Sequence, residues 1–259
     1  MVVTPLEVVG ALVIGGALGL LGGGGSILTV PVFVYAAGLD PKMAVAASLP
    51  VVALTSASGA IAHWTKGNVQ VRTALIYGAT AAVGSFAAAR FASFISGPTQ
   101  LILLALVMLV AAYRMAVSKT LTSASEISDK PIAFTTLIPV ALLVGALTGI
   151  VGVGGGFLIV PTLVIICHLP MRVAVGTSLM VIAMNAASGT AGYAGQVPIP
   201  WSIVLVFSSV AIVGSLLASR FSSRLPQVAL RKGFGVLLVG LAILILVQNR
   251  HTFANWTSS

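Results

Sequence analysis

The stretch GGGGSILTVP, residues 22–31, places four consecutive glycines inside an otherwise apolar segment. A related stretch, GVGGGFLIVP, occupies residues 152–161. Glycine exposes the backbone and costs about 1 kcal/mol relative to alanine in a helix interior. Each run therefore predicts a break in a helix, followed by a short second helix. Paired breaks of this kind, at corresponding places in two halves of a membrane protein, point to a substrate site.

The composition predicts a chain that lies mostly within a lipid bilayer. Hydrophobic residues make up 58% of the 259 positions and charged residues only 7%, whereas about 25% of residues are charged in soluble domains. We therefore predict an all-α polytopic membrane protein. The single cysteine, Cys167, excludes an intrachain disulfide. The net charge of +9 is explained by basic residues in cytoplasmic loops, and we expect no nucleic-acid partner.

The two halves of the chain match at a constant offset of 130 residues, without a gap, from about residue 5 to 95. Shared hydrophobicity could not place glycine and polar positions in register, so the match indicates an internal duplication. The matched pairs include Gly19 with Gly149, Pro31 with Pro161, Ser48 with Ser178, Gly59 with Gly189, and Ser85 with Ser215.

The repeat divides the chain into four parts. We predict a first membrane repeat over 1–117, a polar linker over 118–131, a second membrane repeat over 132–250 and a tail over 251–259. In the first repeat, residues 5–38 form either a glycine-broken span or a re-entrant hairpin, because the piece after the glycines is too short to cross the bilayer. Three spanning helices follow, over 43–62, 73–95 and 99–117. The whole chain then has 8 to 10 membrane segments.

The distribution of Lys and Arg predicts that the two repeats are inverted. If each half changes side an odd number of times, ten of the 13 basic residues gather on one side and three on the other. Basic residues accumulate in cytoplasmic loops, so this asymmetry favours inverted repeats over parallel ones. The prediction places the protein in the inner (cytoplasmic) membrane, with the linker in the cytoplasm and both termini in the periplasm. The larger group comprises Lys66, Arg72, Arg114, Lys119, Lys130, Arg172, Arg220, Arg224, Arg231 and Lys232.

The glycine runs are the first candidate site. The first N–H groups of a helix lack intrahelical partners and lie at the positive end of the helix dipole. Glycine lets these groups face an anion without an intervening Cβ. In inverted halves, two such helix starts would meet near the membrane midplane. The alternative is that the glycines only permit close helix crossing. The candidate residues are Gly23, Gly24, Gly25, Ser26, Gly154, Gly155 and Gly156.

The spans that follow the runs carry a second set of candidates. Hydroxyl and amide groups line one face of each span, and they can donate hydrogen bonds to an anion without carrying charge. The alternative is that they bond their own backbone or a neighbouring helix. Thr55 and Asn185 form the register-matched pair that we expect beside the glycines. The full set is Ser48, Thr55, Ser56 and Ser58 in one span, and Thr177, Ser178, Asn185 and Ser188 in the other.

Other chemistries find little support in the sequence. His63 is not matched by a second histidine, and the adjacent Cys167 and His168 lack the spacing of zinc ligands, so we expect no metal and no other cofactor. The four carboxylates lie at or beyond span ends, which argues against a proton relay in the membrane. No catalytic pair or phosphate-binding loop is evident, so we do not expect an enzyme. A carrier of another small anion or of a metal cation, and a non-transporting membrane protein, remain as alternatives.

The matched motifs resemble those of the TauE/SafE family of sulfite exporters and sulfonate permeases. The motifs are GGGGSILTVP, AVAASL with SASGA, HWTKGNV and GSFAAARF in the first half, and GVGGGFLIVP, AVGTSL with NAASG, and GSLLASRF in the second. The resemblance implies transport of a small sulfur-containing anion, organic or inorganic, across the cytoplasmic membrane. It chooses neither the anion nor the direction of transport. The second half has Val197-Pro198-Ile199 in place of Gly67-Asn68-Val69, so that loop is not carried over as a site.

Overall fold

The computed structural model describes residues 5–21, 24–117, 134–221 and 227–249. The predicted linker over 118–131 and the tail over 251–259 lie outside these ranges, as do Gly22 and Gly23 of the first glycine run. Within the described residues all regular structure is helical and no strand occurs, which confirms the all-α prediction.

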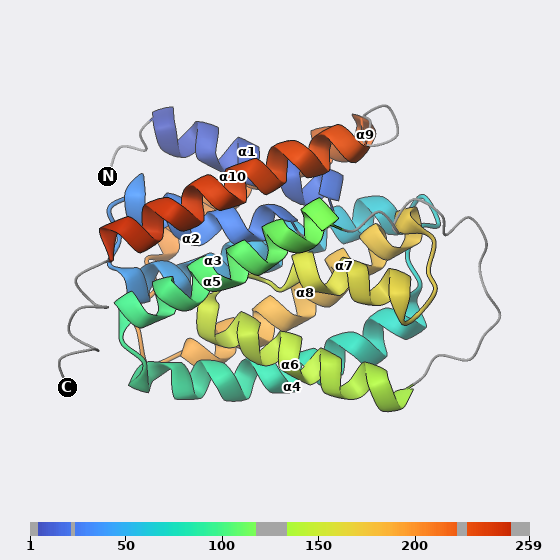
Figure 1. Ribbon diagram of the computed structural model, residues 1–259, viewed down its shortest axis with the longest axis horizontal. Helices are drawn as coiled ribbons and strands as arrows, with labels where there is room; N and C mark the ends of the chain where they lie inside the picture. The colour runs from blue at the N-terminus through green and yellow to red at the C-terminus, as the bar shows by residue number, and fades with distance from the viewer. Residues whose placement is uncertain (1–4, 22–23, 118–133, 222–226, 250–259) are drawn as a thin grey trace.

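Each half contains a long helix, a short helix after its glycine run, and three further long helices (Figure 1). The first half consists of α1 (Pro5–Leu21), the 3₁₀ helix η1 (Gly24–Leu28), α2 (Thr29–Tyr35), α3 (Pro41–Trp64), α4 (Val71–Phe91), the 3₁₀ turn η2 (Ala92–Phe94) and α5 (Gly97–Val117). The second half consists of α6 (Phe134–Val151), α7 (Gly156–Ile165), α8 (Met171–Tyr193), α9 (Trp201–Phe221) and α10 (Gln227–Gln248).

Four helices among the described residues are long and apolar enough to cross a membrane. They are α3, α4, α8 and the Trp201–Ser219 part of α9. At 1.5 Å per residue, the 24 residues of α3 extend about 36 Å, which exceeds the ~30 Å hydrocarbon core. The structure therefore supports a multi-pass membrane protein.

Local chemistry sets the helix ends. Asp40 caps α3, because its side chain accepts a hydrogen bond from the Lys42 amide at 3.0 Å and Pro41 occupies the first helical turn. The predicted span over 73–95 is too long at its end, because α4 stops at Phe91 and the chain tightens into η2. Ser96 precedes α5, and its hydroxyl accepts a hydrogen bond from the Thr99 amide at 3.4 Å and lies 2.7 Å from the Thr99 hydroxyl.

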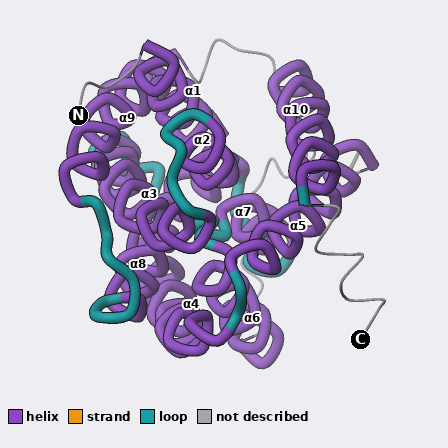
Figure 2. The backbone as a smooth tube through the Cα atoms, turned by 90° about the vertical axis from the view of Figure 1, so that its left-hand side faces the viewer, coloured by secondary structure: helices purple, strands orange, loops and turns teal. Residues whose placement is uncertain are grey.

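The helices of the two halves pack in a reciprocal pattern. Helix α1 packs on α9, and their counterparts α6 and α4 pack on each other. Helix α3 packs on its own counterpart α8, and α5 packs on α10. In Figure 2 the α4–α6 pair and the α1–α9 pair lie on either side of α3 and α8. The duplicated sequence has thus produced a duplicated set of packing contacts.

Glycines set how closely these pairs approach. A Cβ added at Gly15 of α1 would collide with the backbone carbonyl of Ala211 in α9. The same collision occurs between Gly145 of α6 and the carbonyl of Ala81 in α4. Each residue of the first contact has its counterpart 130 positions away in the second. Small residues at these positions therefore permit close packing of both helix pairs.

Helices α3 and α8 run antiparallel to each other. Gly59 of α3 lies against the Leu179 side chain, and Leu49 of α3 lies against Gly189. As the position rises from 49 to 59 along α3, its partner on α8 falls from 189 to 179. The centre of this crossing is position 54 on α3 and position 184 on α8, which are again 130 residues apart.

Candidate functional site

The chain reverses direction at each glycine run. Gly25 of η1 lies against the Leu18 amide of α1, 2.6 Å from the position of an added Cβ. Gly155 lies in the same way against Val144 and Thr148 of α6, and its φ of 69° belongs to the left-handed region that favours glycine. The short segment after each run thus folds back on the preceding helix. The preceding helix, the glycine run and the short helix together form a helical hairpin in each half.

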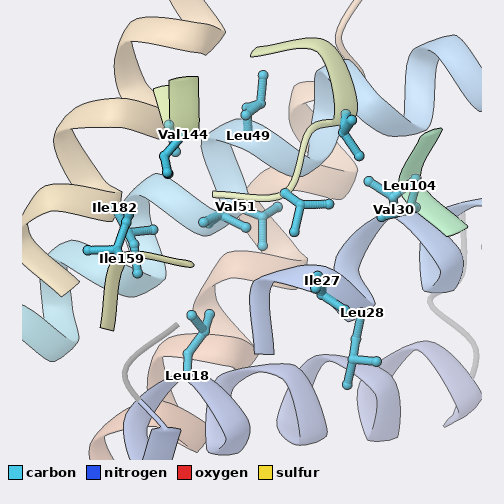
Figure 3. Close-up of a cluster of buried hydrophobic side chains, with 14 of the residues drawn as sticks. Leu18, Ile27, Leu28, Val30, Leu49, Val51, Leu104, Val144, Ile159 and Ile182 are labelled. Carbon is cyan, nitrogen blue, oxygen red and sulfur yellow. The ribbon is translucent and has the colours of Figure 1, made fainter. Parts of the chain in front are cut away.

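The two glycine runs meet in the protein core. A Cβ added at Gly154 would lie 3.3 Å from the Cβ of Ser26, 2.7 Å from Val52 of α3 and 2.9 Å from Ile182 of α8. Val52 and Ile182 are themselves register-matched. Figure 3 shows the apolar side chains around this point, including Ile27 from η1 and Ile159 from α7. The structure therefore brings candidates from both runs to one place.

Thr55 and Asn185 lie beside this meeting point. Thr55 follows Val52 by three residues, and Asn185 follows Ile182 by three residues. Each therefore lies on the same face of its helix as the residue that contacts Gly154. Each is one residue from the centre of the α3–α8 crossing, and both are fully buried. The Thr55 hydroxyl and the Asn185 carbonyl oxygen have no hydrogen-bond partner among the described residues. Buried polar groups are normally paired, so these two atoms are candidates for a ligand.

Asn185 also contacts the second hairpin. Its amide nitrogen donates to the Thr148 hydroxyl at 2.9 Å, and Thr148 donates to the Val144 carbonyl at 3.0 Å. The sequence prediction of site residues missed Thr148. It relied on polar residues that match between the halves, and the residue that corresponds to Thr148 in the first half is Leu18. The arrangement places Asn185, Thr148 and Gly155 next to one another.

The side chains of Ser48 and Ser178 form hydrogen bonds with backbone carbonyl groups. The Ser48 hydroxyl lies 2.7 Å from the Val45 carbonyl and 2.6 Å from the Gly152 carbonyl, to which it donates. It therefore ties α3 to the beginning of the second glycine run. Ser178 donates to the Val175 carbonyl of its own helix at 2.7 Å. Both hydroxyls are buried, and these contacts fit the structural alternative that the sequence left open.

The two helix starts differ. Helix α7 begins at Gly156 directly after the left-handed Gly155, and the Leu158 amide already donates to the Gly155 carbonyl at 2.9 Å. Leu158 is thus the first residue of α7 whose amide bonds a carbonyl within the helix. The amides of Gly156 and Phe157 come before it, so they can donate to a ligand. In the first half, Gly24, Gly25 and Ser26 belong to the 3₁₀ helix η1, and the α-helix starts only at Thr29.

The core around the site is uncharged. Among the described residues, the buried polar side chains are hydroxyls, amides and one imidazole, with no buried Lys, Arg, Asp or Glu. No cluster of three metal-ligating side chains occurs in the described part of the chain. Neutral donors in a low-dielectric core can bind an anion through hydrogen bonds alone.

Two buried aromatic side chains, Phe33 and Tyr193, contact residues of neighbouring helices. Phe33 of α2 is fully buried, and its ring meets the Phe207 ring of α9 edge-on with centroids 4.9 Å apart. The Tyr193 hydroxyl lies 3.0 Å from the amide nitrogen of Gln100. These contacts assign Phe33 and Tyr193 to packing between helices.

The apolar helices, with two glycine-broken helical hairpins in the core, are those of a multi-pass membrane protein. The chain belongs to the family described as "Sulfite exporter TauE/SafE", whose model matches residues 8–245. A "Probable membrane transporter protein" of Xylella fastidiosa (strain 9a5c) is 33% identical over 239 residues, which cover 90% of this chain and 91% of that protein. The "Probable membrane transporter protein YdhB" of Bacillus subtilis is 28% identical over 216 residues, 83% of this chain and 88% of that protein. No solved structure matches the chain significantly.

Proposed function

We propose that this transporter is a permease for a sulfur-containing anion, an organosulfonate or sulfite, in the cytoplasmic membrane. The observation that carries the proposal is the meeting of the two glycine runs between Val52 and Ile182. The proposal is supported by the buried Thr55 hydroxyl, which has no partner among the described residues, and by the family to which the chain belongs, which is named for sulfite export. The anion site comprises the backbone of the two runs together with Thr55 and Asn185.

The chemistry of the site suits an anion of low charge density. A sulfonate spreads its charge over three oxygens, each of which accepts hydrogen bonds. The amides of Gly156 and Phe157 and the Thr55 hydroxyl supply uncharged donors. Amides at a helix start also benefit from the positive end of the helix dipole. Hydrogen bonds from these fixed donors therefore offset the free-energy cost of removing water from the anion.

We further propose that the two repeats are inverted across the membrane. Three observations support this. Helix α3 runs antiparallel to its counterpart α8, the other helices exchange partners reciprocally, and ten of the 13 basic residues fall on one predicted side. A two-fold relation with its axis in the membrane plane accounts for all three. It places the linker in the cytoplasm and both termini in the periplasm.

Substitutions that remove a single hydroxyl group test the anion site. Glycine substitutions are a poor test, because a side chain at Gly25 or Gly155 would disrupt the hairpins themselves. Thr55→Val removes one unpartnered hydroxyl at constant size, so we expect an intact fold and about five- to tenfold weaker anion binding. Thr190→Val on α8 is the matched control, because its hydroxyl bonds the Ala186 carbonyl of its own helix at 2.9 Å.

The measurement is binding and transport with a panel of anions. Purified protein is screened against sulfite, thiosulfate, taurine, sulfoacetate and toluenesulfonate, with nitrate and phosphate as sulfur-free anions. Positive compounds are then tested in proteoliposomes with both variants. A protein that binds sulfur-free anions as tightly, or a Thr55→Val variant that binds as tightly as Thr190→Val, would overturn the proposal.

A further inference from the structure

The second glycine run is held at its entrance by a buried glutamine. Helix α6 ends at Val151, so the Ile150 carbonyl lies in the last turn and has no intrahelical donor. The side-chain amide of Gln100 on α5 donates to this carbonyl at 3.0 Å. Gln100 is fully buried, far from the water that would otherwise satisfy such a carbonyl.

Tyr193 completes this contact. The Gln100 amide nitrogen also donates to the Tyr193 hydroxyl at 3.0 Å, and that hydroxyl lies 3.5 Å from the same Ile150 carbonyl. The three groups come from α5, α8 and α6. Ser48 of α3 holds the Gly152 carbonyl two residues further along. The backbone that enters the second run is thus bonded to three other helices.

The positions that match Gln100 and Tyr193 in the other half of the chain carry different residue types. Helices α5 and α10 start at Gly97 and Gln227, which are 130 residues apart, so position 230 corresponds to Gln100. This position is a leucine, which has no hydrogen-bonding group. Tyr193 corresponds to His63.

His63 does not take the place of Tyr193. Its side chain is 5% exposed, and neither ring nitrogen has a hydrogen-bond partner among the described residues. The Gly19 carbonyl of α1 is near the ring, but it does not meet hydrogen-bond geometry with either nitrogen. The imidazole therefore does not repeat, at the end of α1, the hydrogen-bond geometry that Tyr193 and Gln100 form at the end of α6.

We propose that Gln100 and Tyr193 are positioning residues that fix the second glycine run, so that the two runs act unequally. The second run is the rigid half of the anion site, and η1 on the first half is the part that adjusts during transport. The transport role rests on the proposed function. The difference in rigidity does not, because it follows from contacts that exist without a substrate.

Amide hydrogen exchange of the full chain in lipid nanodiscs, without added anion, tests the difference. We expect residues 24–35 to exchange faster than residues 152–165 in the unmodified protein. Gln100→Leu copies position 230 and should raise exchange over 152–165 about tenfold without changing 24–35. Gln196→Leu is the matched control, because Gln196 lies in the turn after α8 and its side-chain amide donates to the nearby Gly192 carbonyl of that helix, at 3.1 Å. It should leave both segments unchanged.

A converse variant adds the contact instead of removing it. His63→Tyr combined with Leu230→Gln transfers the cluster to the first half and should slow exchange over 24–35. In proteoliposomes it should lower kcat more than it changes KM. Equal exchange of the two segments in the unmodified protein, or a Gln100→Leu variant with unchanged exchange over 152–165, overturns the inference. Because no anion is present in the exchange experiment, these results are independent of whether a sulfur anion is the substrate.

Discussion

Ser26 and Gly154, which are separated by 128 positions in the sequence, lie against each other in the core: a Cβ added at Gly154 would be 3.3 Å from the Cβ of Ser26. This contact joins the two helical hairpins at the crossing of α3 and α8. It places two glycine-rich backbones and two unpartnered polar groups together in an uncharged interior. The predictions below test the contacts that create this arrangement.

The first prediction concerns two adjacent glycines of α1. Gly15→Ala should lower the free energy of unfolding by about 1–3 kcal/mol or more, because the new methyl group meets the Ala211 carbonyl, which no rotamer change can move. Gly16→Ala is the matched control, since nothing lies within 4 Å of its added Cβ. It should be neutral or stabilising by about 0.5–1 kcal/mol. Thermal unfolding in detergent measures both, and equal melting temperatures would contradict the close packing of α1 on α9.

The second prediction concerns the serine that holds the second run. Ser48→Ala leaves the buried Gly152 carbonyl without its donor and should cost about 1–3 kcal/mol of stability. Ser58→Ala on the same helix is the control, because the Ser58 hydroxyl bonds only the Thr55 carbonyl three residues earlier. Its melting temperature should stay close to that of the unmodified protein. A Ser48→Ala variant as stable as Ser58→Ala would show that the contact with Gly152 contributes little.

The third prediction concerns topology. Thr65 and Ala194 follow the ends of the counterpart helices α3 and α8, and both are exposed. In inverted repeats they face opposite sides of the membrane. In a Cys167→Ala background, Thr65→Cys should react with a membrane-impermeant thiol reagent only from the cytoplasmic side. Ala194→Cys should react only from the periplasmic side. Labelling of both from one side would reject the inverted arrangement, as would a cytoplasmic signal from a reporter fused to the C-terminus.

The fourth prediction concerns Cys167, which lies in the turn between α7 and α8. Burial raises the pKa of its thiol from 9.0 to about 11. The thiolate is the reactive form, so two pKa units reduce its population near neutral pH about a hundredfold. Maleimide labelling should therefore be far slower than at Thr65→Cys. The rate should rise about tenfold per pH unit up to pH ~11. Equal rates for the two cysteines at neutral pH would contradict the burial of Cys167.

The sequence by itself determined the class of protein, the duplication and the place of the breaks. A charged fraction of 7% is too small to cover the surface of a soluble protein. Four consecutive glycines strongly disfavour an uninterrupted helix. The offset of 130 residues predicted which positions correspond, and the reciprocal packing of α1 with α9 and α4 with α6 follows this register. These conclusions depend on local preference and periodicity, which a linear sequence records.

The tertiary structure alone decided what each matched residue contacts. Ser48 and Ser178 appeared in the sequence as ligand candidates equal to Thr55 and Asn185, yet Ser48 is bonded to the Gly152 carbonyl while the Thr55 hydroxyl has no partner among the described residues. The roles of Thr148 and Gln100 could not be found by matching the halves, because the residue that corresponds to each of them in the other half is a leucine. A hydrogen bond depends on distances between helices far apart in the chain, and repetition in the sequence does not encode those distances.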